Sequence, residues 1–267
     1  MTELLLYLMT GACAGMLSGL LGVGGGIIIV PALALLLAPH HFPESHLMHV
    51  ALGTSLATIV FTAAASFKAH QRRGSINWQA ARGIAPGVVG GTLLGAWLAA
   101  HIPSDGLKIV FVLFSFYAGT QLLLDYCPPP GRALPGNIAL LGAGGVIGTL
   151  SSLVGIGGGS LSVPFLARCR CPIREAIGTS AFIGLPLALA GTVGYTFTGW
   201  NVAGLPQYSF GFVYLPALAG IALASILTAP LGAALAHRLP VALLKRLFGL
   251  LLYGLGIRML WGMLAVA

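Results

Sequence analysis

The sequence predicts an all-α polytopic membrane protein, made of two inverted-topology repeats with broken or re-entrant helices at glycine turns and about 8–10 membrane segments. The composition, a series of ten apolar segments and an internal duplication predict this class. Hydrophobic residues make up 57% of the 267 residues and charged residues 7%, with a mean hydropathy of +0.97. A soluble domain carries about 25% charged residues, so this composition excludes a soluble enzyme, a nucleic-acid-binding domain and a disordered chain.

The apolar segments follow one another along the chain, separated by short polar or glycine-rich stretches. A helix needs about 20 apolar residues to cross the hydrocarbon core of a bilayer. Two segments, 27–38 and 160–167, directly follow glycine runs and would extend only about 18 Å and about 12 Å as helices. In order, the predicted segments are 4–22, 27–38, 48–67, 80–100, 107–124, 137–155, 160–167, 176–197, 212–236 and 243–264.

The two short segments belong to an internal duplication. Residues 15–33 (GMLSGLLGVGGGIIIVPAL) and 148–166 (GTLSSLVGIGGGSLSVPFL) are identical at 11 of 19 positions without gaps. An A-x-G-T-S motif follows each copy, at 51–55 and at 176–180. We therefore predict a single membrane domain over 1–267, with repeat one at about 1–124, a linker at 125–136 and repeat two at about 137–267.

The charges of the loops predict that the two halves are inverted. Loop 68–82 of the first half holds four Lys or Arg residues, and its second-half counterpart 198–211 holds none; loop 167–175 holds three, and its first-half counterpart 39–49 holds none. Lys and Arg concentrate in cytoplasmic loops, which places 11 of the 13 basic residues inside and both termini outside. A pair of crossings and a re-entrant hairpin both return the chain to the side it left, so this pattern leaves the number of spans open.

The two glycine runs, 22–26 and 155–159, are the most informative residues for function. A new helix is expected after each run, with its free N–H groups and positive dipole end pointing back at the turn, where an anion can bind. We expect the two turns to meet near the membrane midplane and to line a substrate site; alternatively, the glycines only allow close helix packing. The residues expected to bind substrate here are Gly22, Gly24, Gly25, Gly26, Gly155, Gly157, Gly158, Gly159 and Ser160.

A repeated hydroxyl pair forms the second candidate group. Thr54 and Ser55 in the first half match Thr179 and Ser180 in the second. Their hydroxyls are candidates to bind the oxygens of an oxyanion or the glycine turns. The alternative is a hydrogen bond to the helix carbonyl four residues earlier.

Two further polar residues within apolar segments are candidate substrate ligands. Arg258 lies inside the last segment, and its counterpart in the first half is Gln121. A charge at membrane depth is costly and functional by default. Arg258 is expected either to bind the anion directly or to extend its charged end to the outer interface, because the helix ends nearby.

The remaining reactive residues do not form a catalytic pattern. Five histidines, His40, His41, His46, His49 and His101, collect on the side predicted to be outside, where we expect solvated loop positions; a proton-sensing role is the alternative. Cys169 and Cys171 are separated by one residue, which is not the C-x-x-C spacing of a redox or zinc site. We therefore predict no enzyme activity, no cofactor, no metal and no nucleic-acid partner.

At these residues the chain resembles a known family. The duplicated pattern G-x-x-x-G-L-L-G-V-G-G-G-x-x-x-V-P-x-L, at 15–33 and 148–166, with A-x-G-T-S after each copy, is similar to the sulfite exporter TauE/SafE family of membrane permeases. The second copy departs from the pattern at Ser152, where the first has Gly19. The resemblance covers nearly the whole chain.

The resemblance implies movement of sulfite, other sulfur oxyanions or organosulfonates across the bacterial cytoplasmic membrane, with a small anionic substrate and the lipid bilayer as partners. The expected mechanism is alternating access about the two glycine turns; a passive channel is the alternative within transport. The alternative from another class is a membrane-embedded thiol or metal enzyme, or an assembly factor, built on Cys169 and Cys171 with a histidine. No oligomeric state is predicted.

Overall fold

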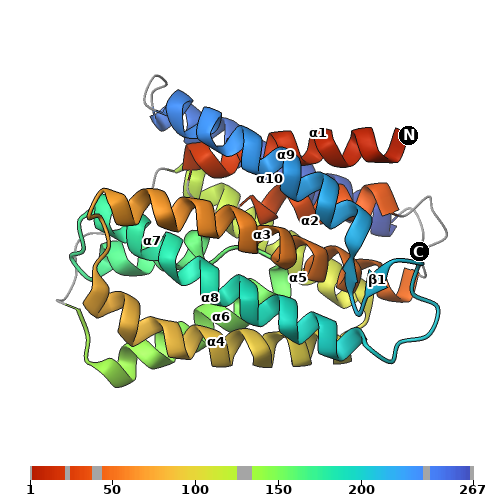
Figure 1. Ribbon diagram of the computed structural model, residues 1–267, viewed down its shortest axis with the longest axis horizontal. Coiled ribbons are helices and arrows are strands. Elements are labelled where there is room, and N and C mark those ends of the chain that lie inside the picture. Colours follow the sequence, from red (N-terminus) through yellow and green to blue (C-terminus); the bar gives the residue numbers. More distant parts are fainter. Residues whose placement is uncertain (1, 22–24, 38–43, 125–133, 237–240, 265–267) are drawn as a thin grey trace.

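The computed structural model of the chain describes residues 2–21, 25–37, 44–124, 134–236 and 241–264. These ranges contain ten α-helices, one short 3-10 helix and one small hairpin of strands (Figure 1). The elements are α1 (Thr2–Leu21), α2 (Gly26–Leu37), η1 (Glu44–His46), α3 (Leu47–Arg72), α4 (Trp78–His101), α5 (Ser104–Leu123), α6 (Asn137–Val154), α7 (Gly159–Arg168), α8 (Ile173–Gly199), β1 (Ser209–Phe210), β2 (Val213–Tyr214), α9 (Leu215–Ala236) and α10 (Val241–Leu264).

Each predicted apolar segment coincides with one of these helices, which confirms an all-α membrane protein with many segments. Five of the described helical stretches are long and apolar enough to cross a membrane, and shorter apolar stretches accompany them. The two predicted short segments are α2, with 12 residues, and α7, with 10. The β1–β2 hairpin was not predicted; it pairs Ser209 with Tyr214 and Phe210 with Val213.

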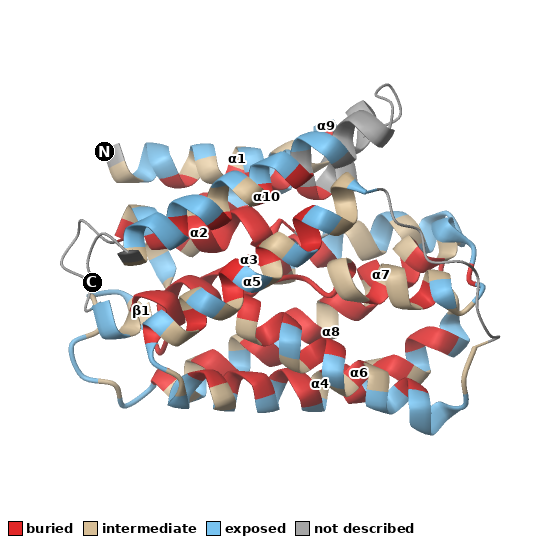
Figure 2. Cartoon of the chain, turned by 180° about the vertical axis from the view of Figure 1, so that it is seen from behind, coloured by how far each residue is buried: buried red, intermediate tan, exposed pale blue. Residues whose placement is uncertain are grey.

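Helices α3 and α8 form the centre of the bundle. They pack against each other, and 67% and 61% of their most apolar stretches are buried, against 33–39% for α4, α5 and α6. Figure 2 shows the buried residues concentrated along these two helices. Among the described residues, the interior is apolar apart from a set of hydroxyl groups and one histidine, so these polar groups are the ones that need explanation.

Most of the other helices of the bundle pack mainly across the predicted repeat boundary, whereas the short helices α2 and α7 pack on α3 and α8 of their own halves. Helix α1 packs along α9, α4 packs along α6 and α8, and α5 packs along α10. The contact of α4 with α6 depends on glycine, because a Cβ atom added at Gly87 or Gly91 would overlap the backbone carbonyl of Leu141 or Gly145. This is the small-residue packing expected of GxxxG rows in membrane helices.

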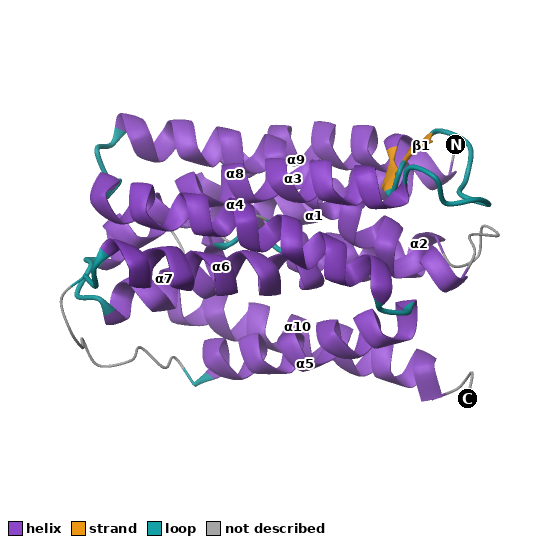
Figure 3. Ribbon diagram, turned by 90° about the horizontal axis from the view of Figure 1, so that it is seen from below, coloured by secondary structure: helices purple, strands orange, loops and turns teal. Residues whose placement is uncertain are grey.

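The ends of the bundle differ in charge. The first helix begins, and the last helix ends, at the end that also carries the β1–β2 hairpin (Figures 1 and 3). The α3–α4 and α7–α8 connections lie at the opposite end, and they carry Arg72, Arg73, Arg168, Arg170 and Arg174. The structure thus gathers the predicted basic loops at one end of the molecule, here termed the basic end; which side of the membrane it faces stays a prediction.

Candidate functional site

Both glycine runs interrupt a helix, as predicted. The first separates α1 from α2 and the second separates α6 from α7. Gly25 and Gly155 have φ angles of +73° and +70°, a conformation that glycine adopts without strain and other residues rarely adopt. Gly155 ends α6, and the amides that follow the helix bond back to its last carbonyls. The predicted residues Gly22 and Gly24 lie outside the described part of the chain.

The two turns touch each other inside the protein. A Cβ atom added at Gly26 would overlap the carbonyl oxygen of Gly155 and would lie 3.1 Å from Cα of Ile156. Gly25, Gly26 and all residues of 155–159 are buried. Figure 3 shows the α6–α7 connection in the middle of the bundle, away from the loops at both ends. The described residues of the two turns therefore meet within the protein, and their position at the membrane midplane stays a prediction.

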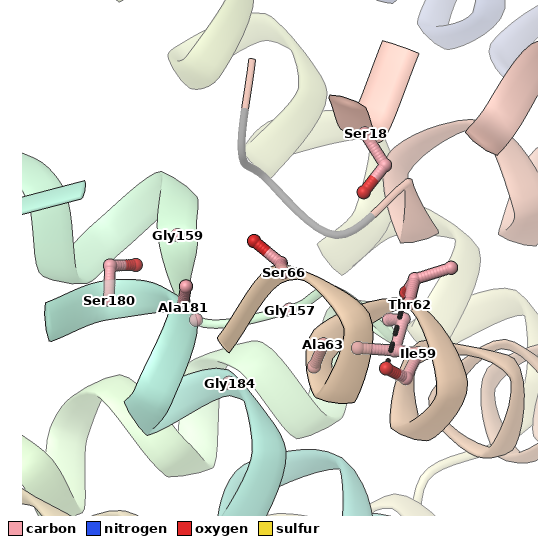
Figure 4. Close-up of a pocket in the computed structure, with 11 residues that line it drawn as sticks. Ser18, Ile59, Thr62, Ala63, Ser66, Gly157, Gly159, Ser180, Ala181 and Gly184 are labelled. Carbon is pink, nitrogen blue, oxygen red and sulfur yellow. Dashed lines mark hydrogen bonds between the residues drawn. The ribbon is translucent and has the colours of Figure 1, made fainter. Parts of the chain in front are cut away.

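A narrow pocket lies beside the second turn (Figure 4). Its volume is about 20 Å³, room for about one water molecule. Ser66 lies six residues before the end of α3 and Ser180 seven residues after the start of α8, which places the pocket about 10 Å along the helices from the basic end. The lining residues come from α1, α3, the second turn, α7 and α8: Ser18, Ile59, Thr62, Ala63, Ser66, Gly157, Gly158, Gly159, Ser180, Ala181 and Gly184.

None of the described residues that line the pocket carries a charge, and most of its surface is apolar, with the hydroxyl groups of four residues, Ser18, Thr62, Ser66 and Ser180, among the lining. Figure 4 shows the hydroxyl groups of Ser18 and Ser66 directed towards the space between α1 and α3. Ser162 lies behind the lining residues Gly158 and Ser180: its Oγ is 2.7 Å from Oγ of Ser180 and 2.6 Å from the carbonyl oxygen of Gly158. The pocket therefore offers hydroxyl and backbone groups to a ligand.

The backbone of the second turn presents its amides more freely than its carbonyls. The hydroxyl of Ser55 donates to the Gly155 carbonyl at 2.8 Å. The Gly158 carbonyl accepts the amides of Leu161 and Ser162. The first amides of α7 have no acceptor within the helix, so the start of α7 carries the partial positive charge of a helix N-terminus. Oγ of Ser160 at this position is buried and lacks a hydrogen-bond partner among the described residues.

The Thr-Ser pairs join the two halves of the chain. Thr54 accepts a hydrogen bond from the backbone N–H of Tyr214, the residue before α9, at 2.9 Å. Thr179 accepts one from the N–H of Asn77, the residue before α4, also at 2.9 Å. Both threonines are fully buried. Each one anchors the start of a helix from the other half, a contact that sequence reasoning missed.

Gln121 and Arg258 do not line this pocket. Gln121 lies with Thr120 and Arg168 in a second pocket, between α5 and α7. The side chain of Arg258 is exposed on α10. Their binding roles stay predictions, and within the described chain the pocket beside the turn is formed without them.

Sequence reasoning missed the α3 wall of the pocket. Ile59, Thr62, Ala63 and Ser66 lie three, four and seven residues apart, which places them on one face of the helix. A helical stripe of small and hydroxylated residues in an apolar segment was the available signal, but it does not recur in the second half, so the duplication did not draw attention to it.

The cysteine pair has the chemistry of inert thiols. Burial first, and then the Glu175 carboxylate and the neighbouring Cys169, raises the pKa of Cys171 to about 11. Its Sγ lies 3.8 Å from Oε2 of Glu175. A thiol with this pKa is protonated at neutral pH, whereas the thiolate is the form that attacks electrophiles and binds metals.

Comparisons with known proteins agree over nearly the whole chain. The family model described as sulfite exporter TauE/SafE matches residues 7–259. A probable membrane transporter protein of Haemophilus influenzae is 40% identical over 260 residues, covering 97% of this chain and 98% of that protein. The probable membrane transporter protein YunE of Bacillus subtilis is 29% identical over 209 residues, covering 71% of this chain and 77% of that protein. No solved structure matches.

The family match spans both glycine turns, both A-x-G-T-S motifs and every helix of the bundle at least in part. It therefore covers the elements that build the pocket as well as those that only surround it. The chain belongs to the sulfite exporter TauE/SafE family.

Proposed function

We propose that this chain is a secondary transporter that moves small anions, sulfite or other sulfur oxyanions and organosulfonates, across the bacterial cytoplasmic membrane by alternating access. Family membership makes it a membrane transporter. The choice of substrate follows the family description, and the mechanism follows the geometry of the turns.

One observation carries the proposal: two helix breaks from different halves of the chain meet inside the bundle, beside an uncharged pocket whose described lining includes serine and threonine hydroxyls. An irregular backbone at membrane depth is tolerated where protein or a water-filled cavity satisfies it. Amides at the start of α7 and the hydroxyls of Ser18, Ser66 and Ser180 favour a ligand that accepts hydrogen bonds. A sulfur oxyanion presents several acceptor oxygens and matches this set of donors.

The paired contacts of the two halves support an inverted repeat. Thr54 anchors the residue before α9, and Thr179 anchors the residue before α4. These helices occupy equivalent places in the two proposed repeats, and the two anchors lie towards opposite ends of the bundle. In the proposed mechanism, the end at Thr54 and the end at Thr179 open in turn. The pocket lies nearer the basic end, which we assign to the cytoplasm.

The test is flux of radiolabelled sulfite into proteoliposomes, with thiosulfate, sulfate and taurine as competing solutes. We expect saturable flux above that of empty liposomes, and counterflow driven by unlabelled sulfite inside. Counterflow separates a carrier from a passive channel. Flux equal to that of empty liposomes for every sulfur compound would remove the substrate class.

A matched pair of variants tests the turn. Leucine at Gly158 would crowd Leu187, Ile183 and Ile147 beside the pocket, whereas Gly142 on α6 has no atom within 4 Å of an added Cβ. We expect Gly158→Leu to lower flux at least tenfold at equal expression, and Gly142→Leu to leave it unchanged. Normal flux in Gly158→Leu would place the substrate path elsewhere.

A further inference from the structure

His49 is a buried histidine near the start of α3. Only 3% of its surface is exposed, in contrast to the solvated position expected from the sequence. Its Nε2 lies 2.9 Å from the carbonyl oxygen of Ala99, so this nitrogen carries a hydrogen and donates. Its Nδ1 is buried and has no hydrogen-bond partner among the described residues. In the neutral ring, Nδ1 is therefore an unused acceptor.

The surroundings of His49 do not provide a counter-charge. Its ring lies 5.0 Å from the ring of Phe212 and 5.7 Å from that of His46, between ring centroids. No described carboxylate lies within ion-pair distance. The described titratable and charged groups on the elements around it are His46 and Glu44 of η1, Glu3 and Tyr7 of α1, His101 of α4, Asp105 and Lys108 of α5, Tyr195 of α8 and Tyr214 of β2.

Several of these neighbouring groups bond to other residues, are exposed to solvent, or are buried without a described partner, as His49 is. Asp105 pairs with Lys108 at 2.7 Å, and Nδ1 of His101 lies 2.8 Å from the carbonyl oxygen of Trp97. The side chain of Glu44 is exposed. Nδ1 of His46 is itself buried without a described partner. A proton on His49 would therefore place an uncompensated charge in an apolar environment, which is costly.

His49 packs against the segment that closes this end of the bundle. The ring of His49 contacts the ring of Phe212. The carbonyl of Phe212 lies against Gly53, and its N–H donates to the Tyr195 carbonyl at 3.2 Å. Two residues later, Tyr214 donates to Thr54. The imidazole is thus covered by the same short segment, 211–214, that Thr54 anchors. Withdrawal of that segment would expose the ring to water.

We propose that His49 is a proton-binding site that couples proton uptake to the opening of this end of the bundle. With segment 211–214 seated, the ring is neutral and its Nδ1 is shielded from water. With the segment withdrawn, water reaches Nδ1 and a proton binds there. Acid therefore favours the open form. The inference deepens the proposed transport mechanism, but its test needs no substrate.

The repeat supplies an internal contrast. Positions 46 and 49 correspond by the repeat to Cys171 and Arg174, near the anchor that Thr179 provides at the basic end. That end has no imidazole at the equivalent place. His70, which lies at that end, has its Nδ1 3.1 Å from Oγ of Ser75 and so already has a partner. An unpartnered imidazole nitrogen is therefore described at the end of His49, and we expect proton control there.

The size of the effect follows from proton linkage. A solvated imidazole takes up its proton with a pKa of about 6.5. If the open form binds the proton and the closed form excludes it, the ratio of open to closed molecules rises about 30-fold from pH 8 to pH 5. Most of that rise falls below pH 6.5.

The experiment measures this ratio directly. The four native cysteines are first replaced by serine. Spin labels are then attached to cysteines introduced at positions 44 and 207, where Glu44 and Gln207 are exposed at this end. Distance distributions between the labels are recorded in lipid nanodiscs at pH 5 and pH 8. We expect a longer-distance population that grows about 30-fold relative to the short one at pH 5. His49→Gln should abolish the growth, and His101→Gln, the exposed histidine at the same end, should retain it.

Two results would overturn the proposal: no pH response in the parent protein, or an undiminished response in His49→Gln. If His49→Gln does not fold, His49→Asn replaces it, because a shorter amide also donates but binds no proton in this range. The measurement is independent of flux, so a failure of the sulfite assay and a failure here are separate outcomes.

Discussion

The contact between the two glycine turns gives the sharpest test of the structure. In Gly26→Ala, the added methyl would overlap the Gly155 carbonyl and lie 2.8 Å from Cδ1 of Ile59. The isoleucine can rotate, but the carbonyl is backbone and is held by the Ser55 hydroxyl at 2.8 Å. The turns must therefore move apart. Overpacking of this kind costs about 1–3 kcal/mol.

The hydrogen bond from Ser55 allows two causes of the lost stability to be separated: steric overlap with the added methyl group, and the restraint that Ser55 places on the Gly155 carbonyl. Ser55→Ala alone should cost about 1 kcal/mol, as loss of one buried hydrogen bond. In the double variant the carbonyl is free to shift, so the combined loss should fall short of the sum by at least about 0.5 kcal/mol. The matched control is Gly142→Ala, which meets no atom within 4 Å and should be neutral or slightly stabilising because alanine favours helix.

The assay is equilibrium unfolding in mixed micelles, followed by circular dichroism, for wild type, the two single variants, the double variant and the control. A Gly26→Ala protein within about 0.5 kcal/mol of wild type would show that the turns do not touch as described. Strict additivity of the two substitutions would show that Ser55 does not hold the Gly155 carbonyl.

Two other predictions concern the buried hydroxyls and the thiols. Thr54→Val and Thr179→Val each leave a half-buried backbone N–H without its acceptor and should each cost about 0.5–1.5 kcal/mol, with Thr→Ser restoring most of the loss; equal stability of Val and Ser variants in the same unfolding assay would contradict the anchors. Cys171, with its pKa raised to about 11, should react with maleimide about 100-fold more slowly at pH 7 than an ordinary thiol, and faster as pH rises towards 11. Glu175→Gln removes a negative neighbour, lowers that pKa and speeds the reaction; an unchanged rate by mass spectrometry would remove Glu175 as a cause.

The helices and the turns were predictable because local sequence determines them. Long apolar runs have few alternatives to helix in a bilayer, and the glycine runs mark where two helices must break. That the turns meet followed from the duplication, since equivalent breaks in two halves of a pseudo-symmetric protein lie near its axis. The Gly26–Gly155 contact agrees with that reasoning.

The partners of the hydroxyls and the burial of His49 were not predictable in the same way. Thr54 bonds to Tyr214, 160 residues away, and Thr179 bonds to Asn77, 102 residues away. These pairings depend on which helix of one half packs on the other half. His49 looked like a loop residue because four other histidines lie nearby in sequence or at the same predicted side; its burial comes from Phe212, in a hairpin that no pattern indicated.

The exchange of helices between the halves has a consequence for biogenesis. Helix α1 finds its main partner in α9, and the hydrogen bond from Ser225 to the Gly11 carbonyl joins residues 214 positions apart. During synthesis the first helix enters the bilayer long before that partner is made. Until α9 has been synthesised, the glycine-containing face of α1 contacts lipid or an insertion factor instead of its partner helix. Truncated or stalled chains therefore expose an unpaired helix face that quality control can recognise.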